Sequence, residues 1–89
     1  MPTTTINIVN KLGLHARAAA KFVNLAKTYS SEVSLSNQGA SVDGKSIMNV
    51  MLLAAPLGSE LTLRVEGADE VEAFESLVAL VDDGFGEAD

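Results

Sequence analysis

The seven residues Glu60-Leu61-Thr62-Leu63-Arg64-Val65-Glu66 alternate without exception between polar and apolar side chains. Successive side chains of a β-strand point to opposite faces of its sheet, so this pattern predicts a strand with one buried face and one face in water. The core face would carry Leu61, Leu63 and Val65. Strands of this kind need packing partners on one side only, which favours an α+β fold of two layers.

Three further strands are predicted from the same kind of pattern. The segment 4–10 is rich in β-branched residues and nearly alternates, with Ile6 and Ile8 on one face. Segments 32–36 and 40–43 alternate again, and the Asn-Gln-Gly between them is typical of a tight turn. These two segments are therefore predicted to form a hairpin.

Three helices are predicted from apolar residues at helical spacing. The first runs from Ala16 to about Tyr29, and the second from Ile47 to about Leu53 behind Ser46 as N-cap. The third begins at Asp69, which forms a capping-box pattern with Glu72, and ends near Gly84. The apolar stripes are Ala19, Phe22, Val23 and Ala26 in the first helix, and Val71, Phe74, Val78 and Val81 in the third.

The element order is therefore β-α-β-β-α-β-α within a single domain spanning residues 1–89. A two-layer α+β sandwich accommodates it, with a mostly antiparallel sheet of four strands and the helices on one face. The pattern does not determine the order of strands in the sheet. A ferredoxin-like arrangement therefore stays open at this point.

Composition excludes several classes of protein. The chain has 89 residues, no cysteine and one histidine, which rules out disulfides and thiolate metal sites and argues against structural zinc. The longest apolar run, 50–57, is too short to span a bilayer, and residues 1–10 lack the pattern of a secretory signal. We expect a cytoplasmic protein that does not insert into membranes.

Charge is distributed unevenly along the chain. The net charge is −6, yet residues 11–45 hold five basic and two acidic side chains, whereas residues 46–89 hold one basic and ten acidic ones. The basic part would attract an acidic protein surface or a phosphate group. The acidic remainder would repel nucleic acid, so no nucleic-acid partner is expected.

The only histidine lies in Gly13-Leu14-His15-Ala16-Arg17, where the chain passes from an extended segment into a helix. Imidazole is a nucleophile that is neutral near physiological pH, and the amides at a helix start suit an anion. Backbone N–H groups of Ala16 and Arg17, together with the Arg17 guanidinium, would therefore hold a phosphate beside His15. This arrangement predicts phosphoryl carriage.

Two other functions compete with this prediction. Residues 39–46 match the spacing of a phosphate-binding P-loop, and Leu80-Val81-Asp82 could pass for a magnesium-binding strand end. However, residues 40–43 alternate like half of a hairpin, and Val81 belongs to a helical stripe, so the context is wrong for nucleotide hydrolysis. A small ferredoxin-like sensing or interaction domain without phosphotransfer is the second alternative.

The Gly-Leu-His-Ala-Arg motif, the later Gly44-Lys45-Ser46-Ile47-Met48, the length and the element order together resemble the HPr family. These are the histidine-containing phosphocarrier proteins of the bacterial phosphoenolpyruvate-dependent phosphotransferase system. The resemblance covers essentially the whole chain. It implies an open-faced β-sandwich of four antiparallel strands with three helices on one side, and a stoichiometric carrier rather than an enzyme, with no cofactor and no metal.

The resemblance also implies roles for individual residues. His15 would be phosphorylated on its pros nitrogen by enzyme I, with phosphoenolpyruvate as the source, and would pass the group to an enzyme II A component. Arg17 would stabilise the phosphate, and Ser46 would be the target of a regulatory HPr kinase/phosphorylase. Residues 10–17 and the pair Asp82-Asp83 look more like the nitrogen-related branch, often called NPr, than like the sugar branch.

The docking surface is the least determined part of the prediction. A short helix needs some of its apolar residues for the core, which we expect of Val50, Leu53 and Ala54. The pattern leaves open whether Ile47, Met48 and Met51 are buried or exposed. If they are exposed, a monomeric carrier would dock its partners through a surface made of Ala20, Lys27, Lys45, Ile47, Met48 and Met51.

Overall fold

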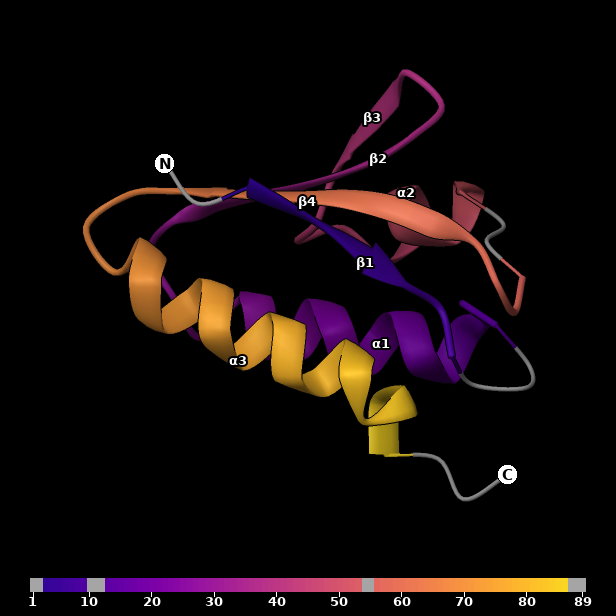
Figure 1. Cartoon of the computed structure of the whole chain (residues 1–89). Helices are drawn as coiled ribbons and strands as arrows, with labels where there is room; N and C mark the ends of the chain where they lie inside the picture. The colour runs from indigo at the N-terminus through magenta and orange to yellow at the C-terminus, as the bar shows by residue number, and fades with distance from the viewer. Residues whose placement is uncertain (1–2, 10–12, 54–55, 87–89) are drawn as a thin grey trace.

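The elements follow one another in the predicted order in the computed structural model, which describes residues 3–9, 13–53 and 56–86 (Figure 1). A 3-10 turn, η1, follows the last helix. The bounds are β1 Thr3–Asn7, α1 Ala16–Ala26, β2 Glu32–Asn37, β3 Ala40–Asp43, α2 Ile47–Leu52, β4 Glu60–Glu66, α3 Glu70–Asp82 and η1 Gly84–Gly86.

The four strands form one open antiparallel sheet in the order β1-β4-β2-β3. In the register of β2 and β4, Val33 pairs with Val65 and Leu35 with Leu63, so apolar side chains gather on one face. Helices α1 and α3 lie along that face, and no helix of the described residues covers the other face (Figure 1). The predicted α+β open-faced sandwich is confirmed. Because β1 is an edge strand rather than an inner strand, the ferredoxin-like arrangement is excluded.

The core fills the space between the sheet and the two long helices. The predicted stripe of α1 is confirmed, since Ala19, Phe22, Val23 and Ala26 are all buried. The predicted strand faces are confirmed as well. They contribute the buried residues Ile6, Ile8, Val33, Leu35, Leu61, Leu63 and Val65.

The predicted stripe of α3 is confirmed at Val81 and wrong at Val71, because the helix is rotated relative to the prediction. The residues fully buried against the core are Ala73, Leu77 and Val81, whereas Val71 is 61% exposed. Phe74 and Val78 flank the buried row and are only half-buried. The prediction left out Ala73 and Leu77, although close packing places the small side chain of Ala73 at the contact.

The predicted capping box at the start of α3 is also wrong. The Asp69 carboxylate makes no bond within its own helix; it accepts hydrogen bonds from the amides of Ser30 and Ser31, at 2.8 and 2.9 Å, and from the Ser31 hydroxyl. These bonds, that of the Ser31 hydroxyl first, lower the pKa of Asp69 to about 2. The amide of Gly67 donates instead to Glu70 Oε1, at 3.2 Å, and lowers the pKa of that carboxyl. The bonds that Asp69 accepts from Ser30 and Ser31 therefore replace the predicted local bonds between Asp69 and Glu72.

Two elements are shorter than predicted. β1 ends at Asn7, although Ile8 still exchanges backbone hydrogen bonds with the turn at Gly58 and Ser59; Asn10 lies outside the described residues. α1 ends at Ala26, and the chain then tightens, because the amides of Thr28 and Tyr29 bond the carbonyls three residues back. The Tyr29 hydroxyl lies 2.6 Å from Ser76 Oγ, which joins the end of α1 to α3.

Candidate functional site

His15 is the N-cap residue of α1. Its backbone is extended, with φ −82° and ψ 178°, and its carbonyl accepts the first helical bond, from Ala19 N at 2.8 Å. Gly13, at φ +70°, turns the chain into this position, where the His15 amide donates to the Gly13 carbonyl at 3.0 Å. Leu14 is buried and anchors the segment in the core. His15 is half-buried, so the residue is not enclosed in the core.

The start of α1 suits a negatively charged group. The side chain of the N-cap residue makes no capping hydrogen bond, and the first turn contains no acidic residue. Helix geometry directs the first-turn amides, which include those of Ala16 and Arg17, toward the space in front of the helix, and the helix dipole makes that space positive. The exposed Arg17 side chain belongs to the same turn. The arrangement can therefore hold a phosphoryl group next to imidazole.

The short helix α2 presents an exposed apolar surface, which we call the α2 patch. The sequence left open whether three of its side chains are buried or exposed. In the structure they are exposed, Ile47 to 37%, Met48 to 77% and Met51 to 41%. Leu52, 76% exposed, completes the patch. Leu52 belongs to the same apolar row in the sequence but was left out of the predicted docking surface, although its position four residues after Met48 places both on one side of a helix.

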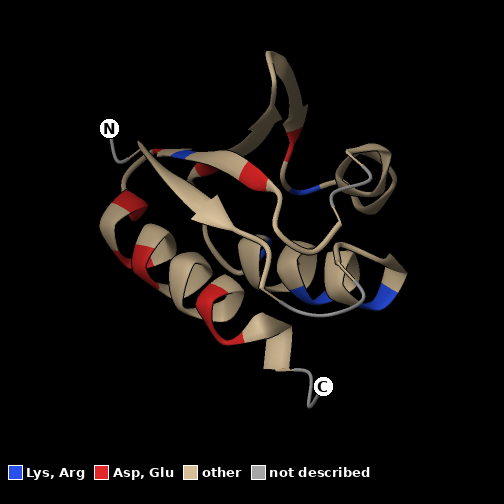
Figure 2. Cartoon of the chain, turned by 45° about the vertical axis from the view of Figure 1, so that its right-hand side comes forward, with Lys and Arg blue, Asp and Glu red and all other residues tan. Residues whose placement is uncertain are grey.

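Two residues hold α2 against the rest of the molecule. Val50 is fully buried and Leu53 nearly so, as predicted; Ala54 lies outside the described residues. Ser46 is the N-cap of α2, as predicted, and its hydroxyl accepts from Asn49 N at 3.4 Å. Figures 1 and 2 show α2 beside the end of α1 that begins at Ala16, and the two helices are in contact. The α2 patch and the His15 turn therefore lie at the same end of the molecule.

Charge separates over the helices. Lys and Arg gather along α1 and Asp and Glu along α3, as Figure 2 shows. Lys27, just after α1, is exposed, and Ala20 is half-buried. Lys45 Nζ donates to the Tyr29 carbonyl at 2.7 Å and ties the start of α2 to the end of α1, just as Lys21 Nζ donates to the Phe85 carbonyl at 2.9 Å. The Lys45 ammonium group therefore already has a structural task.

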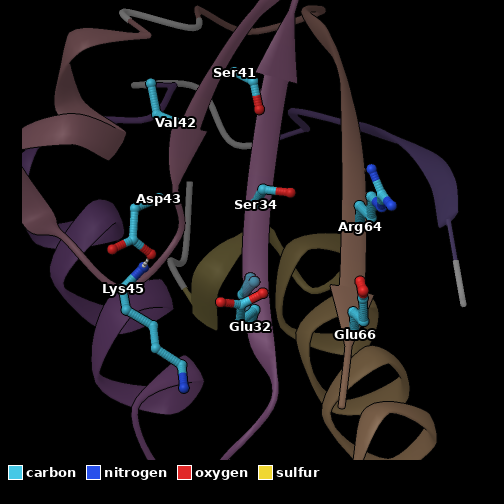
Figure 3. Close-up of a pocket in the computed structure, with 9 residues that line it drawn as sticks. Glu32, Ser34, Ser41, Val42, Asp43, Lys45, Arg64 and Glu66 are labelled. Atoms are coloured by element: carbon cyan, nitrogen blue, oxygen red, sulfur yellow. Dashed lines mark hydrogen bonds between the residues drawn. The ribbon is translucent and has the colours of Figure 1, made fainter.

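A hollow of about 660 Å³ lies on the other face of the sheet. Figure 3 shows Glu32, Ser34, Arg64 and Glu66 on the face away from the helices. Of the predicted site residues only Lys45 lines this hollow. It is therefore separate from the His15 turn and from the α2 patch.

The P-loop alternative fails on the structure. Residues 40–43 form β3, an antiparallel edge strand, whereas a P-loop follows a buried parallel strand. Asp82 is the last residue of α3 and does not end a strand. Among residues 3–9, 13–53 and 56–86, no cluster of three or more His, Cys, Asp or Glu side chains could hold a metal ion. No helix in the described part of the chain is long and apolar enough to cross a bilayer.

Comparison with known proteins shows which family the chain belongs to. The family model described as the PTS HPr component phosphorylation site matches residues 2–83. The chain is 54% identical over 82 residues to the phosphocarrier protein HPr of Cupriavidus necator, which is 92% of either chain. It superposes on HPr of Thermoanaerobacter tengcongensis with a TM-score of 0.94, at 44% identity and 99% coverage of both chains. An HPr dimer of that organism gives a TM-score of 0.78 at 45% identity, over 98% of this chain and all of the other. The chain therefore belongs to the HPr family of phosphocarrier proteins.

Proposed function

We propose that this protein accepts a phosphoryl group on His15 from phosphorylated enzyme I, with phosphoenolpyruvate as the source, and passes it to an enzyme II A component. One observation carries the proposal. The only histidine of the chain is the N-cap of a helix, inside the segment that matches the HPr phosphorylation-site family. The protein would act as a stoichiometric carrier and not as an enzyme, because each molecule is phosphorylated and dephosphorylated once per transfer.

The proposed transfer is a displacement at phosphorus. The lone pair of His15 Nδ1 attacks, the bond from phosphorus to the donor histidine breaks, and a new N–P bond forms. In the product, the phosphoryl oxygens lie before the first turn of α1, where the amides of Ala16 and Arg17 and the Arg17 guanidinium donate to them. A negative charge at a helix N-terminus gains about 0.3–1 kcal/mol. This moderate stabilisation allows the group to leave again.

The proposed docking surface consists of the α2 patch with Ala20, Lys27 and Lys45. We expect it to bind a partner surface with an apolar centre and an acidic rim, because an apolar patch beside basic residues is complementary to such a surface. The exposed side chains of the patch suit contacts that form and dissociate at each transfer.

The test is phosphorylation with enzyme I and phosphoenolpyruvate. We expect one phosphoryl group per chain, stable in alkali and labile in acid as phosphohistidine is. The His15→Ala variant should take up none, and its unfolding curve serves as a control for the fold. Uptake by this variant would contradict the assignment of His15.

Further parts of the proposal concern context. We assign the protein to the cytoplasm as a monomer and to the nitrogen-related branch, and transfer to each enzyme II A component of the same organism tests that branch. Elution as a dimer in size-exclusion chromatography would contradict the monomer. Ser46 is the proposed target of an ATP-dependent HPr kinase/phosphorylase, because a phosphate there would add negative charge beside the α2 patch.

A further inference from the structure

Sulfur in the described part of this chain is confined to the α2 patch. The chain has no cysteine and three methionines, of which Met1 lies outside the described residues. Met48 and Met51 are three residues apart, on one side of α2. Any oxidant that reacts with sulfur within residues 3–9, 13–53 and 56–86 therefore acts on this patch.

We propose that Met48 is a site of reversible oxidation by hydrogen peroxide, and that its sulfoxide weakens docking at the α2 patch. The inference rests on the proposed function. One oxygen atom moves from peroxide to the thioether: the O–O bond breaks, an S–O bond forms, sulfur loses two electrons, and water is released. A methionine sulfoxide reductase that draws electrons from thiols reverses the step.

Exposure selects Met48 over Met51. The Met48 side chain is 77% exposed, against 41% for Met51, so its sulfur meets dissolved peroxide more readily. Met48 also contributes nothing to the core, because α2 is held by Val50 and Leu53. Oxidation should therefore leave the fold intact.

The expected effect follows from the polarity of the product. A thioether fits against apolar partner surfaces, whereas a sulfoxide is polar and must be desolvated on docking. Ile47 and Leu52, its apolar neighbours in the patch, have no side-chain group that could hydrogen-bond the sulfoxide oxygen. The sulfoxide has no net charge, so this loss should persist at high salt, unlike a loss caused by added negative charge.

The experiment treats the intact protein with graded hydrogen peroxide. Peptide mass spectra measure one added oxygen at each methionine, and phosphoryl uptake from enzyme I is measured against carrier concentration. Each protein is compared with its own untreated form. We expect Met48 to oxidise first and the apparent KM to rise about tenfold with kcat unchanged, equivalent to about 1.4 kcal/mol of docking. Reductase treatment should restore the KM, and Met48→Leu should not respond to peroxide at doses that leave Met51 intact.

The outcomes separate this inference from the proposed function. An unchanged KM after complete oxidation of Met48, or an equal response in Met48→Leu, would overturn the inference while leaving the carrier role in place. Loss of the circular dichroism signal on oxidation would also overturn it, because the effect would then be on folding. Absence of phosphoryl uptake by the untreated protein would overturn the proposed function and this inference with it.

Discussion

Substitution of Ser46 should separate stability from docking. In Ser46→Ala the N-cap of α2 is lost, because the Ser46 hydroxyl accepts from Asn49 N. Loss of such a cap destabilises a protein by about 0.5–2 kcal/mol. The bond here is 3.4 Å long, beyond the favoured range, so we expect the lower half of that interval, about 0.5–1 kcal/mol. For a domain of this size that is a fall in Tm of roughly 2–8 °C.

Ser46→Asp should behave in the opposite way in the two assays. Aspartate is also a good N-cap, and its charge is favourable at the start of a helix, so stability should stay within about 0.5 kcal/mol of the wild type. The new charge lies directly before Ile47 and Met48, in the proposed docking surface. If the partner is acidic there, repulsion should raise the apparent KM for phosphoryl uptake from enzyme I about tenfold.

The assay is a pair of measurements on both variants. Thermal unfolding reports the cap, and phosphoryl uptake at rising carrier concentration reports docking, at low and at high salt. The gap between Ser46→Asp and wild type should narrow at high salt, because exposed charges are then screened. A wild-type KM in Ser46→Asp would refute the reasoning and place Ser46 outside the docking surface.

Three further predictions concern other residues. Arg17→Ala should leave the fold intact and slow phosphoryl transfer at least about tenfold, though less than the 10³-fold or more known for arginines on phosphoryl groups elsewhere. Stopped-flow measurement of transfer, with Lys27→Ala as the control variant, checks this. Equal slowing in the two variants would contradict the role of Arg17. The lowered pKa of Asp69, about 2, predicts that its contribution to stability is complete above pH 4 and is lost as the pH falls through 2. Unfolding at pH 2–5 should show a weaker pH dependence for Asp69→Asn, and an unchanged slope would argue against the bond with Ser31. Gly67→Ala would place a Cβ 2.7 Å from Ser31 Cα and should lower the free energy of unfolding by about 1–3 kcal/mol. The loss should be clearly smaller in Gly58→Ala, where the added Cβ has open space. Equal losses of the two variants in urea unfolding would rule out the clash.

The spacing of apolar residues along the chain predicted most of the fold, because burying one side of a strand or helix directly imposes that spacing. The strand at 60–66 alternates because one face meets helices and the other meets water, and the α1 stripe repeats because one side of a helix faces the sheet. These patterns depend on each element alone. The elements at 47–52 and 32–43 were therefore found close to their observed bounds as well.

The errors occurred where distant segments meet. Asp69 stands before a helix with an acidic residue three positions on, yet its carboxylate bonds to Ser30 and Ser31, because the β4–α3 connection packs against the end of α1. The burial of Ala73 in place of bulkier residues likewise depends on how closely α3 approaches its neighbours. Neither contact leaves a periodic signal in the chain.

The candidate site divides in the same way. The sequence alone determined the position of His15 before an alanine-rich helix and of Arg17 two residues later, because a helix start is encoded by neighbouring residues. Only the tertiary structure decided that the α2 patch is exposed and that α2 lies beside the start of α1. The hydrogen bond from Lys45 Nζ to the Tyr29 carbonyl was likewise visible only in the tertiary structure. The physical reason is that a helix pattern shows which residues share a side, whereas the side that meets the core is chosen by packing against elements far away in the chain.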